Sequence, residues 1–155
     1  LNIIFNNLPK IIKDPSNVQV RENICFAALL GGINVGNASS CLPHRLQQAM
    51  GSVPEVSHPH ARGLACLYPE WLSNVYPYCE DSIKKIKSIL NLKSDGYEFI
   101  LEFMKKIHLD NKLSQYGVKK NHIEQFLENV SGNLENDPIP ISKITKELMQ
   151  NIYLK

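Results

Sequence analysis

The chain has 155 residues, 43% of them hydrophobic, and its 17 Lys and Arg residues nearly balance 15 Asp and Glu residues. This length predicts a single domain spanning residues 1–155, large enough to bury a substantial core. The net charge of +2 excludes the concentrated basic face that a nucleic-acid-binding protein needs. No apolar run approaches the ~20 residues of a membrane span, so we expect neither a nucleic acid nor a membrane as a partner.

Apolar residues at helical spacing begin directly at the N-terminus. The first segment, Leu1–Ile12, predicts the end of a helix that begins upstream. The second segment, Asn17–Ser40, is apolar nearly all round, which predicts a central, buried helix. A glycine inside a helix costs about 1 kcal/mol. Gly31, Gly32 and Gly36 therefore indicate that another helix, or a bound molecule, approaches this backbone closely.

A short helix is predicted next. Pro43 suits its first turn and Gly51 suits its end. Within it, His44, Gln47 and Gln48 have the spacing that places side chains on one helical face. This face therefore gathers one imidazole and two carboxamides.

The following helix is predicted to start within Ser57–His60 and to run through Leu72. The partial positive charge of its N-terminus disfavours the imidazolium form of His60, and the neutral form is the one that binds a metal. The rest of the chain predicts further amphipathic helices, and no alternating strand pattern persists. We therefore predict an all-α helical bundle. The further helices span Asp81–Leu90, Asp95–Leu109, Lys119–Val130 and Ser142–Leu154, with Ser142 as the N-cap of the last.

The four cysteines, at positions 25, 41, 66 and 79, include no Cys-x-x-Cys pair. Cys25 and Cys66 lie within apolar runs and are predicted to be small buried residues. The spacing is not that of a zinc knuckle or a disulfide framework, which indicates a reducing, cytoplasmic environment. Cys41 has no evident activating partner, and no glycine-rich phosphate-binding motif occurs.

The histidines give a weak metal signal. His44 and His60 are 16 positions apart, on two predicted neighbouring helices that can bring the imidazoles together. A metal site needs three or four ligands, so surface or capping roles stay open for both. His58 is an additional candidate ligand in the loop, where simple exposure is the alternative. His108 and His122 are predicted to be surface residues.

The stretch LLGGINVGNASSCLPHRLQQAMG, followed by SHPHARGLACLYP, resembles the metal-binding segment of the iron-containing (group III) alcohol dehydrogenases. In that family a helix glycine precedes a ligand histidine by twelve residues, and a Leu-Gly or Met-Gly pair closes the short helix. A second ligand histidine then opens a helix that ends in Leu-Leu-Pro. The matching residues here are Gly32, His44, Met50-Gly51, His60 and Pro69, and flanking motifs such as Asn136-Asp137-Pro138 extend the resemblance over essentially the whole chain.

The resemblance implies a fold and an activity. The fold is the all-α, dehydroquinate synthase-like C-terminal domain of a two-domain dehydrogenase. The activity is the NAD- or NADP-dependent interconversion of an alcohol and an aldehyde or ketone, with hydride passing to the nicotinamide. The partners implied are the chain's own N-terminal nucleotide-binding domain and a small alcohol or aldehyde, with a homodimer as a candidate assembly.

The resemblance also implies a metal site. In the family one Asp and three His hold a divalent metal, usually Fe²⁺ and sometimes Zn²⁺, which lowers the pKa of the alcohol. Carried to this sequence, His44 and His60 are the second and third histidine ligands. The Asp and the first His form an Asp-x-x-x-His motif, which no Asp of this chain begins. With half of the ligands, the isolated chain is expected to bind metal poorly and to be inactive, whereas the complete protein is expected to be an enzyme.

Two further residues are implied to face the substrate and cofactor, Gln48 and Val35. Gln48 stands where many members have another histidine, and a carboxamide can hydrogen-bond a substrate but cannot transfer a proton near pH 7. The alternative to the enzyme is a non-catalytic helical interaction or assembly module derived from the family. Such a module would expose apolar surface that a partner domain otherwise covers.

Overall fold

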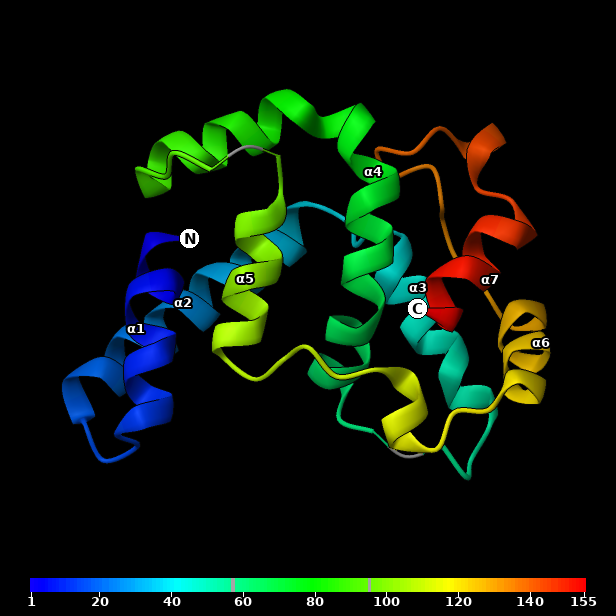
Figure 1. Cartoon of the computed structure of the whole chain (residues 1–155), viewed down its shortest axis with the longest axis horizontal. Helices are drawn as coiled ribbons and strands as arrows, with labels where there is room; N and C mark the ends of the chain where they lie inside the picture. The colour runs from blue at the N-terminus through cyan, green and yellow to red at the C-terminus, as the bar shows by residue number, and fades with distance from the viewer. Residues whose placement is uncertain (57, 95) are drawn as a thin grey trace. The chain divides into compact units, whose positions relative to one another are not determined.

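The computed structural model describes residues 1–56, 58–94 and 96–155, which form helices and no strand (Figure 1). The predicted all-α fold is confirmed. In these residues the elements are α1 (Asn2–Lys13), α2 (Val18–Asn37), α3 (Leu42–Ala49), η1 (Met50–Ser52), α4 (His60–Leu90), α5 (Glu98–Lys106), η2 (Leu113–Tyr116), α6 (Lys120–Glu128), η3 (Ile141–Lys143) and α7 (Lys146–Leu154), where η marks a 3-10 helix.

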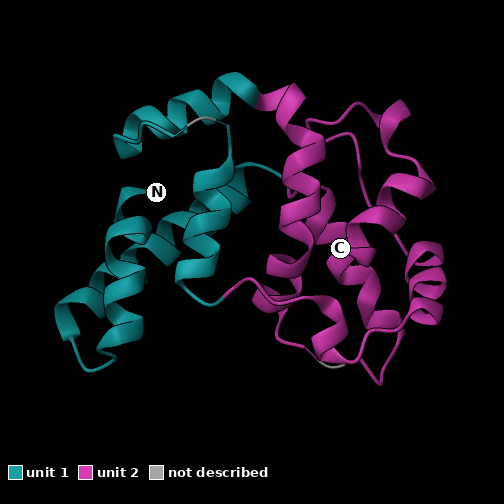
Figure 2. Cartoon of the chain, viewed as in Figure 1, with its two compact units in different colours: residues 1–39, 80–108 teal, residues 40–79, 109–155 magenta. Residues whose placement is uncertain are grey.

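The chain divides into two compact units (Figure 2). Unit 1 contains residues 1–39 and 80–108, and unit 2 contains residues 40–79 and 109–155. The single domain expected over residues 1–155 stays a prediction.

Unit 1 is built on the pairing of α1 with α2. The Asn17 side chain accepts a hydrogen bond from the backbone N–H of Val20 at 3.0 Å, which caps the N-terminus of α2. The Phe5 ring of α1 stacks on Phe103 of α5 with ring centroids 4.0 Å apart. Aromatic contact therefore joins α5 to the helix pair.

The prediction that α2 is buried is wrong in this structure. Val20 is its buried residue, while Leu29 is 60% exposed and Val35 is 67% exposed. A helix that is apolar nearly all round needs cover on every side, and within unit 1 α1 packs along only part of it. Cys25 is exposed as well, against prediction.

The glycines of α2 also depart from expectation. A Cβ built on Gly31, Gly32 or Gly36 meets no atom within 4 Å. The close approach predicted from these glycines is therefore not seen within the described residues of unit 1, and nothing in that unit explains why three glycines stand in one helix.

Unit 2 holds the main apolar core. Its central side chains come from α3, η1, α4, α6 and α7, so elements far apart in sequence share one core. Cys66 is buried here, as predicted. Tyr153 donates a hydrogen bond from its hydroxyl to the backbone carbonyl of Leu46 at 2.6 Å, and burial raises the pKa of this phenol. The fully buried core side chains include Leu42, Leu46, Met50, Val53, Leu67, Phe126 and Ile152.

His122 is buried, at 8% exposure, so its predicted surface position is wrong. Its Nδ1 accepts a hydrogen bond from the backbone N–H of Lys119 at 3.3 Å, which caps the start of α6. The capping role explains why an imidazole stands at this core position. His108 is exposed, as predicted.

The buried carboxylate of Asp137, 7% exposed, ties three segments of unit 2 together. Its Oδ2 accepts hydrogen bonds from the Leu42 backbone N–H at 2.8 Å and from the Trp71 indole N–H at 3.0 Å. Its Oδ1 accepts from the Ile139 backbone N–H at 2.9 Å. Asp137 thereby connects the first turn of α3, the middle of α4 and the loop that follows α6.

Several helix boundaries differ from prediction. α4 runs to Leu90 as one assigned helix, but Cys79 has a non-helical backbone, with φ −134° and ψ 20°. Pro77 lies two residues earlier, and proline disrupts the helical hydrogen bonds around it, so the pattern resembles two helices. The last helix is capped by Thr145, whose hydroxyl accepts from the Leu148 N–H, and not by Ser142. α4 begins at His60, within the range Ser57–His60 predicted for its start, and the start predicted at Asp95 lies outside the described residues.

No single helix among the described residues is long and apolar enough to cross a membrane. The segments Val18–Asn37 and Leu42–Ser52 meet that test only as a pair, by length and composition.

Replacing Asp137 with Ala should lower the free energy of unfolding by about 2–4 kcal/mol, because it leaves buried N–H groups without an acceptor. Chemical denaturation of the variant measures this loss. Asp110→Ala is the matched control, since Asp110 is exposed in the same unit and its removal should change stability by less than about 0.5 kcal/mol. Equal stability of the two variants would contradict the bridging role of Asp137.

Candidate metal centre

The structure brings His44 and His60 together within unit 2. His44 is the third residue of α3, and His60 is the first residue of α4. Their ring centroids are 5.5 Å apart and the ring planes are inclined by 57°. His44 is half-buried and His60 is exposed, so the pair is open to solvent on one side.

The surroundings of His44 favour the neutral imidazole. Burial lowers the pKa of His44, and the nearby His60 and Arg45 lower it further. The pKa of His58 is lowered in the same way, by burial and then by His60. Because a ligand histidine must be neutral to offer a lone pair, these shifts suit metal binding.

Gln47, and not Gln48, contacts the histidines. Its Oε1 is 2.5 Å from Nδ1 of His60, and its Nε2 is 3.3 Å from Nε2 of His58. Gln48 is exposed, and its Oε1 accepts a hydrogen bond from Arg45 at 3.4 Å. The shared helical face of residues 44, 47 and 48 is the sequence signal that pointed to both amides, but it did not distinguish them.

His58 is half-buried against the first turn of α4. Its ring centroid is 6.4 Å from that of Tyr116. A Cβ built on Gly63 would overlap the His58 ring and would lie 3.2 Å from Cγ of Gln47. The absence of a side chain at residue 63 is therefore what leaves room for His58, which is a packed residue and not a freely exposed loop tip.

The two imidazoles fit as part of a metal site. Imidazole nitrogen is a ligand type that suits both iron and zinc. Among the described residues, however, no group of three or more His, Cys, Asp and Glu side chains could hold a metal ion. His44 and His60 can thus supply two of the three or four protein ligands that such a site needs.

The two other residues singled out in the sequence are Val35 and Cys41. Val35 belongs to unit 1 and is exposed, so its predicted role stays a prediction. The Cys41 thiol has its pKa raised by burial and then by Asp137. A raised pKa disfavours the thiolate, which agrees with the absence of an activating partner inferred from the sequence.

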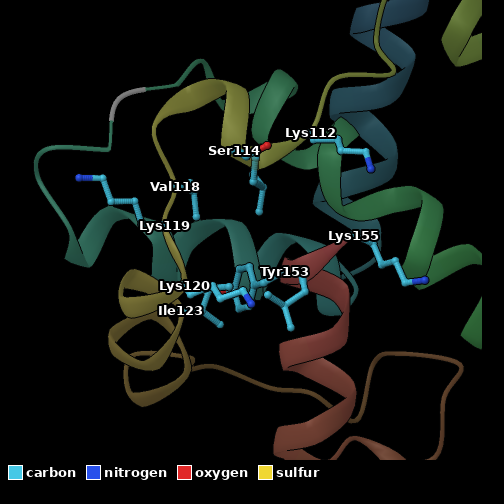
Figure 3. A pocket seen from close by; sticks show the side chains of 10 residues that line it. Lys112, Ser114, Val118, Lys119, Lys120, Ile123, Tyr153 and Lys155 are labelled. Carbon is cyan, nitrogen blue, oxygen red and sulfur yellow. The ribbon is translucent and has the colours of Figure 1, made fainter.

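A pocket of about 180 Å³ in unit 2 has a basic rim (Figure 3). Lys112, Lys119, Lys120 and Lys155 line it together with apolar residues. In Figure 3 the amino groups of Lys119 and Lys155 point to opposite sides of the pocket. The lysines therefore do not converge on one ligand position, and the residues lining this pocket include no histidine or carboxylate side chain.

Comparison of the sequence with known proteins identifies one family and several relatives. The family model of the Fe-containing alcohol dehydrogenases, C-terminal part, matches residues 1–155. The long-chain primary alcohol dehydrogenase AdhA of Thermoanaerobacter ethanolicus is 26% identical, over 99% of this chain and 41% of that protein. The probable NADH-dependent butanol dehydrogenase 1 of Bacillus subtilis (strain 168) is 22% identical, over 86% of this chain and 38% of that protein.

The 1,3-propanediol dehydrogenase of Klebsiella pneumoniae is 25% identical, over 89% of this chain and 38% of that protein. The chain therefore spans about two fifths of the length of the curated relatives that it matches. No solved structure matches.

The lowered pKa of His44 predicts a loss of stability in acid. Below the ordinary value of 6.5 the unfolded chain takes up a proton at residue 44 more readily than the folded chain, so the free energy of unfolding falls as the pH falls. Thermal unfolding of metal-free protein at about pH 7.5 and about pH 5.5 measures this dependence. His44→Gln should lose less stability on acidification than the wild type. An equal loss would contradict the lowered pKa of His44.

Gly63→Ala should destabilise the protein by about 1–3 kcal/mol, because the added methyl group must displace the His58 ring. Gly51→Ala is the matched control, since a Cβ there meets no atom within 4 Å. Urea denaturation of both variants measures the free energy of unfolding and so compares the two substitutions. If Gly63→Ala is as stable as Gly51→Ala, the packing described for His58 is wrong.

Proposed function

The chain belongs to the Fe-containing alcohol dehydrogenase family, of which it is a C-terminal part, and from this membership we propose that it is the metal-binding helical part of an NAD- or NADP-dependent enzyme. The enzyme interconverts an alcohol and an aldehyde or ketone. The observation that carries the proposal is the approach of His44 and His60 in a chain that the family model matches throughout.

His44 and His60 would hold a divalent metal, Fe²⁺ or alternatively Zn²⁺, through their neutral imidazoles. When bound, such a metal supplies Lewis acidity toward an alcohol or carbonyl oxygen. The remaining ligands, an Asp and a third His, come from outside residues 1–155. Since the chain by itself offers half of this ligand set, we expect it to have no turnover alone.

Gln48 is proposed to contact the substrate. Its side chain is exposed on α3, four residues after His44, and its amide can donate to or accept from a substrate oxygen. It cannot act as a general acid or base, so the proton of the alcohol must leave by another group. Val35 is proposed to face the substrate or the nicotinamide, by family position alone.

The remaining parts of the enzyme are proposed to cover the apolar side chains of α2. Phe26 and Ile33 are each 52% exposed, and Leu29 is 60% exposed. Contiguous apolar exposure of this kind marks a surface that binds protein. We propose an N-terminal nucleotide-binding domain as the partner, and a cytoplasmic location and a homodimer as further expectations.

The same apolar exposure favours a second candidate function, a non-catalytic assembly module. In that case α2 would bind another protein and the two histidines would hold no metal. Metal content of the purified complete protein distinguishes the two functions.

His60→Ala in the complete protein should abolish both metal retention and alcohol oxidation, because a single imidazole would remain from this chain. Elemental analysis after gel filtration and a nicotinamide absorbance assay measure the two effects. The control is His108→Asn, since His108 is exposed and has a left-handed backbone, with φ 57°, that Asn tolerates. Full metal content and activity in His60→Ala would contradict the proposed metal site. A wild-type protein without metal would favour the assembly module.

A further inference from the structure

Gln47 lies between His58 and His60 and contacts a ring nitrogen of each, at 3.3 Å and 2.5 Å. All three residues belong to unit 2. From this arrangement we propose that Gln47 is a positioning residue, which holds His60 in the tautomer able to bind a metal. This inference rests on the proposed metal site. We also assign His58 the role of orienting Gln47, in place of its candidate role as an extra ligand.

The oxygen end of the carboxamide selects the tautomer of His60. An amide oxygen can only accept a hydrogen bond. With Oε1 of Gln47 against Nδ1 of His60, the proton of the neutral ring must lie on Nδ1. The lone pair is then on Nε2, which is free to bind a metal. Ligand histidines are commonly oriented in this way, by donating their other ring N–H to an oxygen acceptor.

The nitrogen end of the carboxamide makes His58 a hydrogen-bond acceptor, whereas His60 is a donor. An amide NH₂ group can only donate, so Nε2 of His58 must accept its hydrogen bond and the proton of neutral His58 lies on Nδ1. If the amide were reversed, Nδ1 of His60 would have to accept, and the proton would block its Nε2. The two tautomers are therefore coupled through one side chain.

The tautomer of His58 is a sensitive indicator of this coupling. Its Nδ1 is buried and has no hydrogen-bond partner among the described residues. A buried N–H without an acceptor costs about 1–3 kcal/mol, so the local surroundings of His58 do not themselves favour a proton on Nδ1. Only the contact with Gln47 requires it.

Nitrogen NMR of the complete protein, labelled with ¹⁵N-histidine and loaded with Zn²⁺, tests the coupling directly. We expect His60 to be bound through Nε2, and His58 to be unbound and protonated on Nδ1. In Gln47→Met, which has similar size but no amide, His58 should carry its proton on Nε2. A zinc-bound nitrogen on His58, or a proton on its Nε2 in the wild type, overturns the inference.

Zn²⁺ affinity, measured by competition with a chelator, tests the effect on the metal. Gln47→Met should weaken Zn²⁺ binding about 10–100-fold, the usual effect of losing an outer hydrogen-bond partner of a ligand. Gln47→Glu keeps an oxygen acceptor for His60 and should retain most of the affinity. Because Glu and Met both resemble Gln in size, a packing role alone does not predict this difference between the two variants. Gln150→Met, on the exposed side of α7, is the control and should bind like the wild type.

These results separate the inference from the proposed function. If the wild type binds neither Zn²⁺ nor Fe²⁺, the proposed metal site itself is wrong. If the wild type binds Zn²⁺ and Gln47→Met binds it equally well, the metal site stands and the positioning role of Gln47 is overturned.

Discussion

The arrangement of unit 2 depends on the carboxylate of Asp137. Helix α3 has 8 residues, too few for a stable helix on its own, so tertiary contacts must hold it. Asp137 accepts hydrogen bonds both from the first turn of α3, at Leu42, and from Trp71 of α4. Since α3 carries His44 and α4 begins with His60, this one side chain joins the two helices that present the imidazoles.

Much of the fold follows from local sequence pattern, and most departures come from tertiary packing. Apolar spacing and capping residues such as Asn17 define helices within a few positions, and the short helix and the helix start that carry His44 and His60 are of this kind. Burial is not local. α2 has the composition of a core helix, yet unit 1 covers it only in part. The sequence predicts His122 at the surface, yet its side chain is buried and caps the start of α6.

At the candidate site, too, the sequence pattern predicts positions but not side-chain contacts. Helical spacing placed residues 44, 47 and 48 on one face, but it could not tell which amide turns toward the second histidine. That choice depends on the first turn of α4, where a glycine at 63 leaves space for the His58 ring beside Gln47. Family resemblance directed attention to Gln48, because it compares positions and not contacts. The contact of Gln47 with both rings becomes visible only when the side chains are placed.

The hydrogen bond from Tyr153 to Leu46 joins residues 107 positions apart, and this separation has a consequence for synthesis in the cell. At about 5–20 residues per second, α3 leaves the ribosome on the order of 5–20 s before the tyrosine that binds it. During that interval the backbone carbonyl of Leu46, whose side chain is fully buried in the finished fold, lacks its hydrogen-bond donor. The contacts of the helix bearing His44 are thus completed late, and until then this part of the nascent chain is open to chaperones and proteases.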